Sequence, residues 1–315
     1  MSASTKHPST LLVVIAFALV YVVWGSTYFF IQMGIKHMPP LVLGATRFIL
    51  SGGIMLAWCL FTGEKVWNLK FNIHSAISGL LMLFGGNGAL IWAERTVPSA
   101  LAAILVSAAP VWFVLLDKSH WRANFTNVFT ILGLIIGFGG VVLLFSDQLD
   151  NALGEHSTAH LSDLVVIIVG SMLWAAGSLY SKYKATGNST TVNTAWQMLA
   201  AGVAFIPFSL MHGDFKGFSF DALPAQTWYA VGYLVIFGSI IAFSAYVWLL
   251  EVRPAAQVST YAYVNPVIAV ILGVAFANES ITWLQIGGLV IILISVLLIN
   301  LDKYRKPKQA ELAVE

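Results

Sequence analysis

Polar and aromatic side chains able to bind a solute gather at a few places in a chain that is otherwise apolar. The densest group lies between residues 256 and 277, where Tyr261, Tyr263 and Asn265 directly precede Pro266. Because proline has no N–H, Pro266 leaves the carbonyl about one helical turn earlier without its usual donor. Hydroxyl, amide and carbonyl groups placed together in this way suit a solute that carries an amine.

Similar groups occur in other apolar segments. Asn87 lies among glycines that would let a ligand approach the backbone closely, and Ser107 lies shortly before Pro110. The candidate substrate-binding residues are Trp24, Tyr28, Asn87, Ser107, Trp174, Tyr180, Ser259, Tyr261, Tyr263 and Asn265, and the candidate hinges are Pro110 and Pro266. The competing interpretation is close helix packing for the single hydroxyl residues and ordinary core for the tryptophans and Tyr261.

Arg47 and Glu94 are the candidates for coupling or gating. Arg47 is the one clear charge inside an apolar segment, about 10 Å from the segment's end by helical rise. A charge at membrane depth is a functional candidate, although a long side chain near the surface can also extend outward as an anchor. Glu94 ends the third apolar segment, and the central turns hold no carboxylate. Facilitated diffusion or exchange is therefore favoured over obligatory proton coupling.

Motifs of enzymes and metal sites are missing from the sequence. There is no phosphate-binding glycine loop of the ATPase type and no nucleophile elbow. Cys59 is the only cysteine, and the seven histidines lie in tails, in loops or at segment ends. We therefore expect no catalytic residue, no metal site and no cofactor.

The composition of the chain indicates which structural elements must position these residues. The chain of 315 residues is 58% hydrophobic and 10% charged, with a mean hydropathy of +0.83, which excludes a soluble globular protein, a disordered chain and a nucleic-acid binder. Short polar stretches divide the chain into apolar segments at 11–33, 40–61, 74–93, 99–117, 127–146, 164–183, 191–212, 227–249, 256–277 and 283–301. Each is long enough to cross a bilayer as a helix, and none alternates like a porin strand.

The positions of lysine and arginine predict the orientation. If the N-terminus is cytoplasmic, the inner loops and tails hold twelve of these residues and the outer loops hold three. Because cytoplasmic loops are enriched in positive charge, both termini are expected in the cytoplasm. The acidic loop 147–163 then faces outward. We expect the chain in the cell inner (plasma) membrane.

The second half of the chain repeats features of the first half in the same order. Pro98 and Pro110 lie twelve residues apart, as do Pro254 and Pro266. Other matches are Phe84-Gly85-Gly86 with Phe237-Gly238-Ser239, and the region of Trp24 to Tyr28 with that of Trp174 to Tyr180. Five segments per half is an odd number, so the second half enters the membrane inverted. Inverted repeats are typical of transporters with a site near the midplane.

Several of these stretches are similar to a known family. They are Trp24-Gly25-Ser26, Arg47-Phe48, Trp92 to Ser99, Ala255 to Pro266, and Asn278 to Thr282 leading into Gly287-Gly288. The chain resembles the drug/metabolite transporter superfamily, within it the ten-helix EamA family, and Trp92 to Ser99 looks most like the YedA-like subgroup. The resemblance covers about residues 11–301 and implies export of small metabolites, often amino acids. One departure is Asn278, where the family commonly has glycine.

The sequence thus predicts an all-α polytopic membrane protein of ten transmembrane helices in two inverted five-helix repeats. The expected divisions are a cytoplasmic tail (1–10), a first EamA-like repeat (11–146), an acidic external loop (147–163), a second EamA-like repeat (164–301) and a basic cytoplasmic tail (302–315).

The expected function is a carrier that exports small metabolites, amino acids being the favoured class, by alternating access around a midplane cavity. Its expected partners are a small-molecule solute and the lipid bilayer, with no nucleic acid and no soluble protein. The alternative within transport is a multidrug or organic-cation exporter, with proton coupling through Glu94 as an option. A membrane enzyme acting on lipid-linked substrates and a receptor without flux are the alternatives from other classes.

Overall fold

The computed structural model describes residues 9–93, 95–97, 99–146, 149, 160–277 and 281–305, and every regular element in these ranges is a helix. Eight helices within these ranges are long and apolar enough to cross a membrane. They are α1 (Thr10–Ile35), α2 (Pro40–Phe61), α3–η1–α4 (Leu69–Gly79, Leu80–Asn87, Gly88–Ala93), α10 (Leu161–Lys184), α11 (Thr190–His212), α12–η4–α13 (Ala225–Tyr233, Leu234–Ile241, Ala242–Val252), α14–α15 (Ala255–Val258, Tyr261–Ala277) and α16 (Trp283–Arg305).

Two further helical segments lie where the sequence predicts the fourth and fifth spans. The fourth is α5 (Ser99–Val106) followed, after a break, by α6 (Ala109–Leu116), and the fifth is α8 (Val128–Leu144), which has 17 residues. Every predicted apolar segment is therefore helical in the described part of the chain, although these two are broken or short. The all-α polytopic membrane fold is confirmed.

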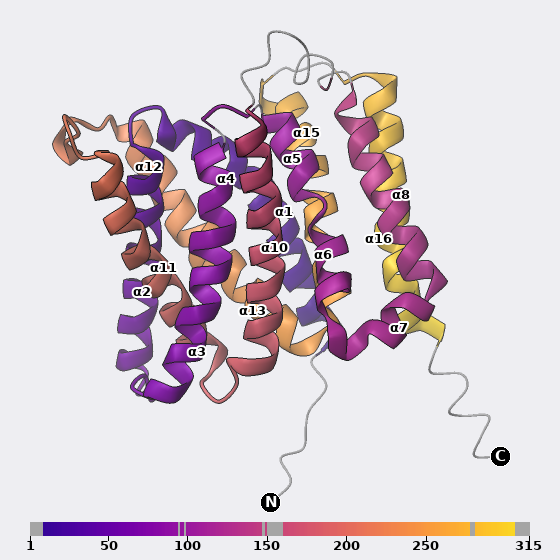
Figure 1. The fold of residues 1–315 in the computed structure, drawn as a ribbon, viewed down its shortest axis with the longest axis horizontal. Helices are drawn as coiled ribbons and strands as arrows, with labels where there is room; N and C mark the ends of the chain where they lie inside the picture. The colour runs from indigo at the N-terminus through magenta and orange to yellow at the C-terminus, as the bar shows by residue number, and fades with distance from the viewer. Residues whose placement is uncertain are drawn as a thin grey trace, which may run out of the picture.

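In the described parts of the chain, the short helices between the spans are η2 (Lys118–His120), α7 (Trp121–Thr126) and η3 (Phe220–Ala222). The segment formed by η2 and α7 is bent by 66° from the fourth span. It crosses one end of the bundle in Figure 1 instead of prolonging the span.

Local sequence signals set the helix ends. The Asn127 side chain accepts the backbone N–H of Phe129 at 2.9 Å at the start of α8, and Ser189 caps α11 through the N–H of Val192 at 3.2 Å. Such side chains satisfy N–H groups that have no partner within the helix. α11 stops at Gly213, whose φ of +79° suits glycine.

The third and eighth spans each contain a π-helical segment near the middle. These segments are η1 and η4. They fall where the sequence repeats Phe84-Gly85-Gly86 as Phe237-Gly238-Ser239. π-helical turns widen a helix locally and occur frequently at functional sites.

The helices pack in a pattern that follows the internal repeat. α2 packs along α11 and α8 packs along α16, which pairs the second span with the seventh and the fifth with the tenth. α1 packs against α13 and α15, and α10 packs correspondingly against η1 and α6. Figure 1 shows α1 and α10 in the centre and the α8–α16 pair at one edge. The exchange of partners between halves is the two-fold pattern that an inverted repeat predicts.

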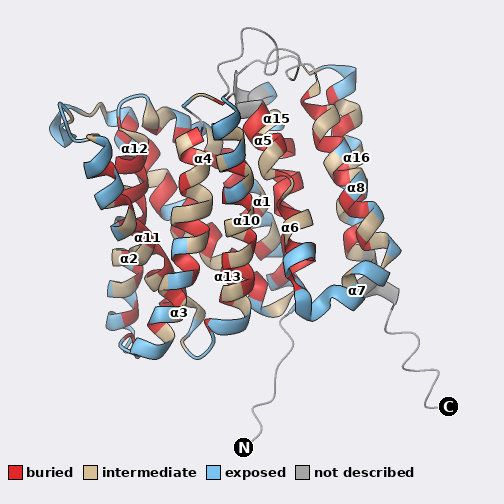
Figure 2. Ribbon diagram, in the orientation of Figure 1, coloured by how far each residue is buried: buried red, intermediate tan, exposed pale blue. Residues whose placement is uncertain are grey.

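Glycines let paired helices approach closely. A Cβ atom at Gly79 would lie 2.1 Å from the Gln197 carbonyl oxygen, and one at Gly288 would lie 2.8 Å from the Leu144 nitrogen. Only glycine fits at either contact, as is common between membrane helices. Figure 2 shows the buried residues on faces turned toward neighbouring helices.

Candidate functional site

A cavity lies in the centre of the bundle, between the two halves of the chain. The space inside it, counted with its open mouth, is about 820 Å³. The first half lines it from α1, α2, η1, α4, α5 and α6, and the second half from α10, η4, α13 and α15. Its lining side chains that carry a hydroxyl, amide or guanidinium group are Thr27, Tyr28, Arg47, Asn87, Ser171, Ser239, Tyr261 and Asn265.

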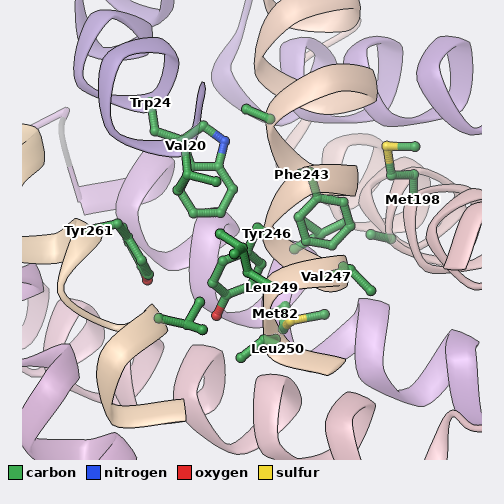
Figure 3. Packing of buried hydrophobic residues seen from close by; sticks show 14 of the residues in the cluster. Val20, Trp24, Met82, Met198, Phe243, Tyr246, Val247, Leu249, Leu250 and Tyr261 are labelled. Atoms are coloured by element: carbon green, nitrogen blue, oxygen red, sulfur yellow. The ribbon is translucent and has the colours of Figure 1, made fainter. Parts of the chain in front are cut away.

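Aromatic rings form the deep wall of the cavity. The ring centroid of Trp24 lies 5.0 Å from that of Tyr261 and 5.6 Å from that of Trp174, with both pairs close to perpendicular. The ring centroid of Tyr246 lies 4.9 Å from that of Trp24, and Figure 3 shows Tyr246 between Tyr261 and Phe243, below Trp24. Edge-to-face packing of this kind stabilises aromatic clusters.

The polar tips of these aromatic residues are bonded within the protein. The Trp24 Nε1–H donates to the Gly238 carbonyl at 3.0 Å, and the Trp174 Nε1–H donates to the Tyr246 hydroxyl at 3.1 Å. Tyr246 also shares a hydrogen bond of 2.6 Å with Ser178. The wall is therefore fixed in place.

Three buried polar atoms on the cavity have no hydrogen-bond partner in the described structure. They are the side-chain oxygens of Asn87, Asn265 and Ser171. A buried polar atom without a partner costs about 1–3 kcal/mol. Since native proteins pair most such atoms, this group at one cavity indicates a place for a polar ligand.

Arg47 turns into the bundle. Its side chain is 5% exposed, its Nε–H donates to the Ser239 hydroxyl at 2.7 Å, and its Cζ lies 5.0 Å from the centre of the Phe48 ring. The sequence left open that the Arg47 side chain extends outward to the membrane surface. The structure shows instead that it points into the bundle. The guanidinium is part of the cavity lining.

The cavity extends toward one end of the bundle. Its lining reaches Ile31 and Leu90 in the last turns of α1 and α4, and Ile167 near the start of α10. On α10 the deepest lining residue is Trp174, about 15 Å by helical rise from the end of that helix at Lys184. The cavity thus reaches from the middle of the bundle toward its upper end in Figure 1.

Hydrogen bonds hold the opposite end of the bundle together. The Tyr183 hydroxyl donates to the buried carboxylate of Asp117 at 2.8 Å, which joins the end of α10 to the end of α6. The Lys182 ammonium donates to the carbonyls of Leu250 and of Arg253, the latter at 2.9 Å, which joins α10 to the end of α13. These contacts join α6, α10 and α13 at the end of the bundle that the cavity lining does not reach.

The structure brings many of the predicted site residues to one cavity. Predicted residues on its lining are Trp24, Tyr28, Arg47, Asn87, Trp174, Tyr261 and Asn265. They come from five different spans, which explains why no local sequence motif joins them. Their roles in binding stay predictions.

Ser107 contacts backbone carbonyls instead of the cavity. Its hydroxyl lies 2.7 Å from the Ala103 oxygen and 2.9 Å from the Ala262 oxygen. The Ala262 carbonyl is the one that Pro266 leaves without a helical donor. The expectation that this carbonyl is free for a solute amine is therefore corrected, because Ser107 occupies it from the fourth span.

Three other predicted residues lie away from the cavity lining. The Tyr180 hydroxyl is 2.7 Å from His74 Nδ1, and the Ser259 hydroxyl donates to the Ala256 carbonyl. Tyr263 packs among residues of α8 and α16 and donates to the Leu134 carbonyl at 3.0 Å. In this conformation all three serve packing and helix contacts. Glu94 lies outside the described residues.

The two candidate hinge prolines have different settings. Pro110 stands in the first turn of α6, directly after the break in the fourth span, where its missing N–H removes no helical bond. Pro266 lies inside α15, and the break in the ninth span comes earlier, between α14 and α15. Their hinge role stays a prediction.

Sequence reasoning missed three residues of the site. Ser171 and Ser239 line the cavity, and Tyr246 supports both tryptophans from behind. A signal for Ser239 existed, since it closes the repeated Phe237-Gly238-Ser239 motif. Among the described residues, no cluster of three or more His, Cys, Asp or Glu could hold a metal ion.

Comparison with known proteins assigns the family. The model of the EamA-like transporter family matches residues 11–146 and matches again over residues 161–301. The chain belongs to the EamA-like transporter family. It is therefore a multi-pass membrane transporter, and the double match agrees with the repeat in its helix packing.

Named relatives of this EamA-like chain are also transporters. "Uncharacterized inner membrane transporter YedA" from Escherichia coli (strain K12) is 36% identical over 302 residues, covering 94% of this chain and 93% of that protein. "Uncharacterized transporter YoaV" from Bacillus subtilis (strain 168) is 26% identical over 271 residues, covering 84% and 88%. The YedA-like character expected from Trp92 to Ser99 is confirmed.

A solved structure supports the fold. It is named "Crystal structure of protein" and matches with a TM-score of 0.76 over 95% of this chain and all of that chain, at 18% identity. At this identity the likeness concerns the fold alone.

Proposed function

We propose that this transporter exports small metabolites, amino acids above all, by alternating access around the central cavity. The observation that carries the proposal is the set of partnerless polar atoms on a cavity shared by both halves. Such atoms replace part of the hydration of a polar solute, and a site between inverted repeats is exposed to each side in turn when the halves rock.

The proposed setting is the inner membrane with both termini in the cytoplasm. The excess of lysine and arginine on one set of loops supports this orientation, and the name of the Escherichia coli relative supports the membrane. The cavity then faces outward in the described conformation. Its closed end, tied by Tyr183 and Lys182, faces the cytoplasm.

The proposed energetics are facilitated diffusion or exchange. Among the described residues on the cavity lining there is no Asp or Glu to carry a proton. Proton-driven carriers commonly hold such a carboxylate at membrane depth. A gradient of the solute itself, or exchange for a second solute, would then drive transport.

Counterflow in proteoliposomes tests the proposal. Vesicles loaded with one amino acid at a time, without an ion gradient, should accumulate the same labelled amino acid from outside. Asn265→Ala combined with Trp174→Ala should reduce this accumulation strongly, because both side chains line the cavity. Unaltered rate and selectivity in this double variant would contradict the proposed site. Accumulation of hydrophobic organic cations with indifference to amino acids would favour the multidrug alternative.

Alternating access has its own test at the closed end. In a Cys59→Ala background, which removes the one buried native cysteine, Leu90→Cys places a thiol on the cavity lining. Adding Tyr183→Phe breaks the bond to Asp117 and should favour opening at the cytoplasmic end. Labelling of the thiol by an impermeant maleimide from outside should then fall several-fold, whereas unchanged labelling would speak against a gate at Tyr183.

A further inference from the structure

Arg47 is a buried cation with an incomplete set of partners. Its Nε–H donates to Ser239, and the guanidinium contacts the Phe48 ring. Within the described ranges, neither of its Nη atoms has a hydrogen-bond acceptor, and no carboxylate lies within ion-pair distance. The side chain is nevertheless 5% exposed and lies on the cavity.

This arrangement is costly without a partner for the charge. A buried cation without a counter-ion is strongly disfavoured, and buried arginines in proteins are normally paired with an anion. A guanidinium presents parallel N–H groups that match the two oxygens of a carboxylate. The N–H groups on the Nη atoms of Arg47 can thus donate to a carboxylate that no residue in the described ranges supplies.

Neighbouring residues fix the guanidinium toward the cavity. A Cβ atom at Gly238 would lie 3.0 Å from the Arg47 Nη2 atom, so the absence of a side chain there leaves space for the guanidinium. Ser239 holds the Nε–H from the next position of η4. The repeated motif in the eighth span therefore gives Arg47 both its space and its anchor.

Other groups on the same cavity suit a positive charge. The side-chain oxygens of Asn87 and Asn265 lack partners, and Trp24, Trp174 and Tyr261 offer ring faces and edges. Amide oxygens and aromatic faces both attract an ammonium group. A single arginine beside neutral acceptors suits one carboxylate and one amine better than a phosphate.

We propose that Arg47 binds the carboxylate of the transported solute while the amides of Asn87 and Asn265 bind its ammonium group, so that the substrates are zwitterions with a free carboxylate. This inference rests on the proposed export function and names the recognition at the same cavity. Decarboxylated amines and amino-acid amides are then poor substrates, in contrast to the organic-cation alternative.

The test uses the full-length protein and matched probes. Leucine and phenylalanine carry both charged groups; leucinamide, phenylalaninamide, isoamylamine and phenethylamine lack the carboxylate. Counterflow in proteoliposomes measures transport, and the shift in melting temperature in detergent measures binding separately. Loss of the carboxylate should weaken transport and binding roughly 10- to 100-fold, as for loss of a hydrogen bond to a charged group.

Variants of Arg47 show whether this residue carries the discrimination. Arg47→Gln should bind amino acids as weakly as their amides. Arg47→Lys should restore part of the preference for amino acids over their amides, because lysine keeps the charge but lacks the paired N–H groups of arginine. Arg95→Gln is the matched control, since Arg95 is exposed with its Cζ 4.4 Å from the centre of the Trp92 ring. Size-exclusion profiles and melting temperatures establish that each variant is folded.

The outcomes separate this inference from the proposed function. The role of Arg47 is overturned if the wild type transports and binds amino acids and their amides equally. It is also overturned if a folded Arg47→Gln variant keeps the full preference for amino acids over their amides. Carboxylate binding that depends on Arg47 without any transport supports the inference while the export function fails. If none of the carboxylate probes binds or is transported, the inference fails as well.

Discussion

The two π-helical segments, η1 and η4, have the same irregular backbone but make different contacts around the cavity. η1 in the third span ends at Asn87, whose side-chain oxygen meets the cavity without a partner. η4 in the eighth span bonds to its neighbours: the Gly238 carbonyl accepts from Trp24, and the Ser239 hydroxyl accepts from Arg47. The segment η1 therefore presents a polar group to the cavity, and the segment η4 positions polar groups that belong to other helices.

The difference shows how an inverted repeat can build an asymmetric site. Duplication supplies two equivalent widened turns beside one cavity, and substitution at single positions then gives them different chemistry. In our account η1 contributes one acceptor for an ammonium group, and η4 supports the residue that binds a carboxylate. The predictions for Asn87, Gly86, Gly238 and Ser239 each change one of these two segments, and Ser107 serves as a residue outside both.

The largest effect is expected for Asn87→Leu. Counterflow of the transported amino acid should fall roughly 10- to 100-fold, because a hydrogen bond to a charged group is lost. The melting temperature should hold or rise, since the change removes an unpaired buried oxygen. Asn72→Leu is the control: Asn72 is also buried but donates to the Val66 carbonyl and accepts from Asn188. It should lower the melting temperature and leave selectivity intact.

Alanine at one glycine of each repeated motif, Gly86 and Gly238, should separate stability from binding. A Cβ atom at Gly86 would lie 2.9 Å from the Trp174 Cβ atom and 3.1 Å from the Gly170 carbonyl oxygen, so it pushes against the helix α10 itself. Gly86→Ala should destabilise the protein by about 1–3 kcal/mol, as overpacking does. At Gly238 the nearest atom is the movable end of Arg47. Gly238→Ala should lower amino-acid transport with little change in melting temperature. An equal fall in melting temperature in Gly86→Ala and Gly238→Ala would contradict this difference between the two glycines.

A smaller effect is expected for Ser239→Ala. The guanidinium of Arg47 keeps its charge but loses the acceptor of its Nε–H. Loss of a positioning contact of about 1 kcal/mol corresponds to a few-fold weaker apparent affinity. The effect should appear as a higher KM with an unchanged maximal rate. A strong fall in the maximal rate would instead assign Ser239 to the transport step.

The smallest effect on transport is expected for Ser107→Ala. Its hydroxyl supports the Ala262 carbonyl, so the loss should lower stability by about 1 kcal/mol and leave selectivity unchanged. Thermal unfolding and counterflow measured on the same preparation check this. A change of selectivity would return Ser107 to the binding residues.

The spans could be predicted from the sequence because the bilayer thickness determines their length and polar residues mark their ends. The segment 40–61 coincides with α2, and 191–212 differs from α11 by one residue. The repeated prolines and the Phe-Gly motif also indicated the inverted repeat, since both lie at related places in the two halves. These signals are local in sequence and need no knowledge of packing.

The site could be predicted only in part, because hydrogen bonds between distant spans decide which polar groups remain free. Asn265 and Ser107 are both polar residues near a proline, yet one amide oxygen stays unpaired and the other side chain supports a carbonyl 155 residues away. Nothing within either span distinguishes them. The direction of Arg47 depended in the same way on Ser239, which lies in the other half of the chain.

Counterflow with two double variants tests the central claim most directly. Asn87→Leu with Asn265→Leu removes both partnerless amides from the cavity, and Ser107→Ala with Tyr180→Phe removes two polar groups that bond elsewhere. With both proteins folded and reconstituted at equal density, the first should lose accumulation of labelled amino acid to the background of empty vesicles. The second should keep the wild-type rate. Full activity in the first pair, or loss of activity in the second alone, would contradict the account that the shared cavity is where the solute binds.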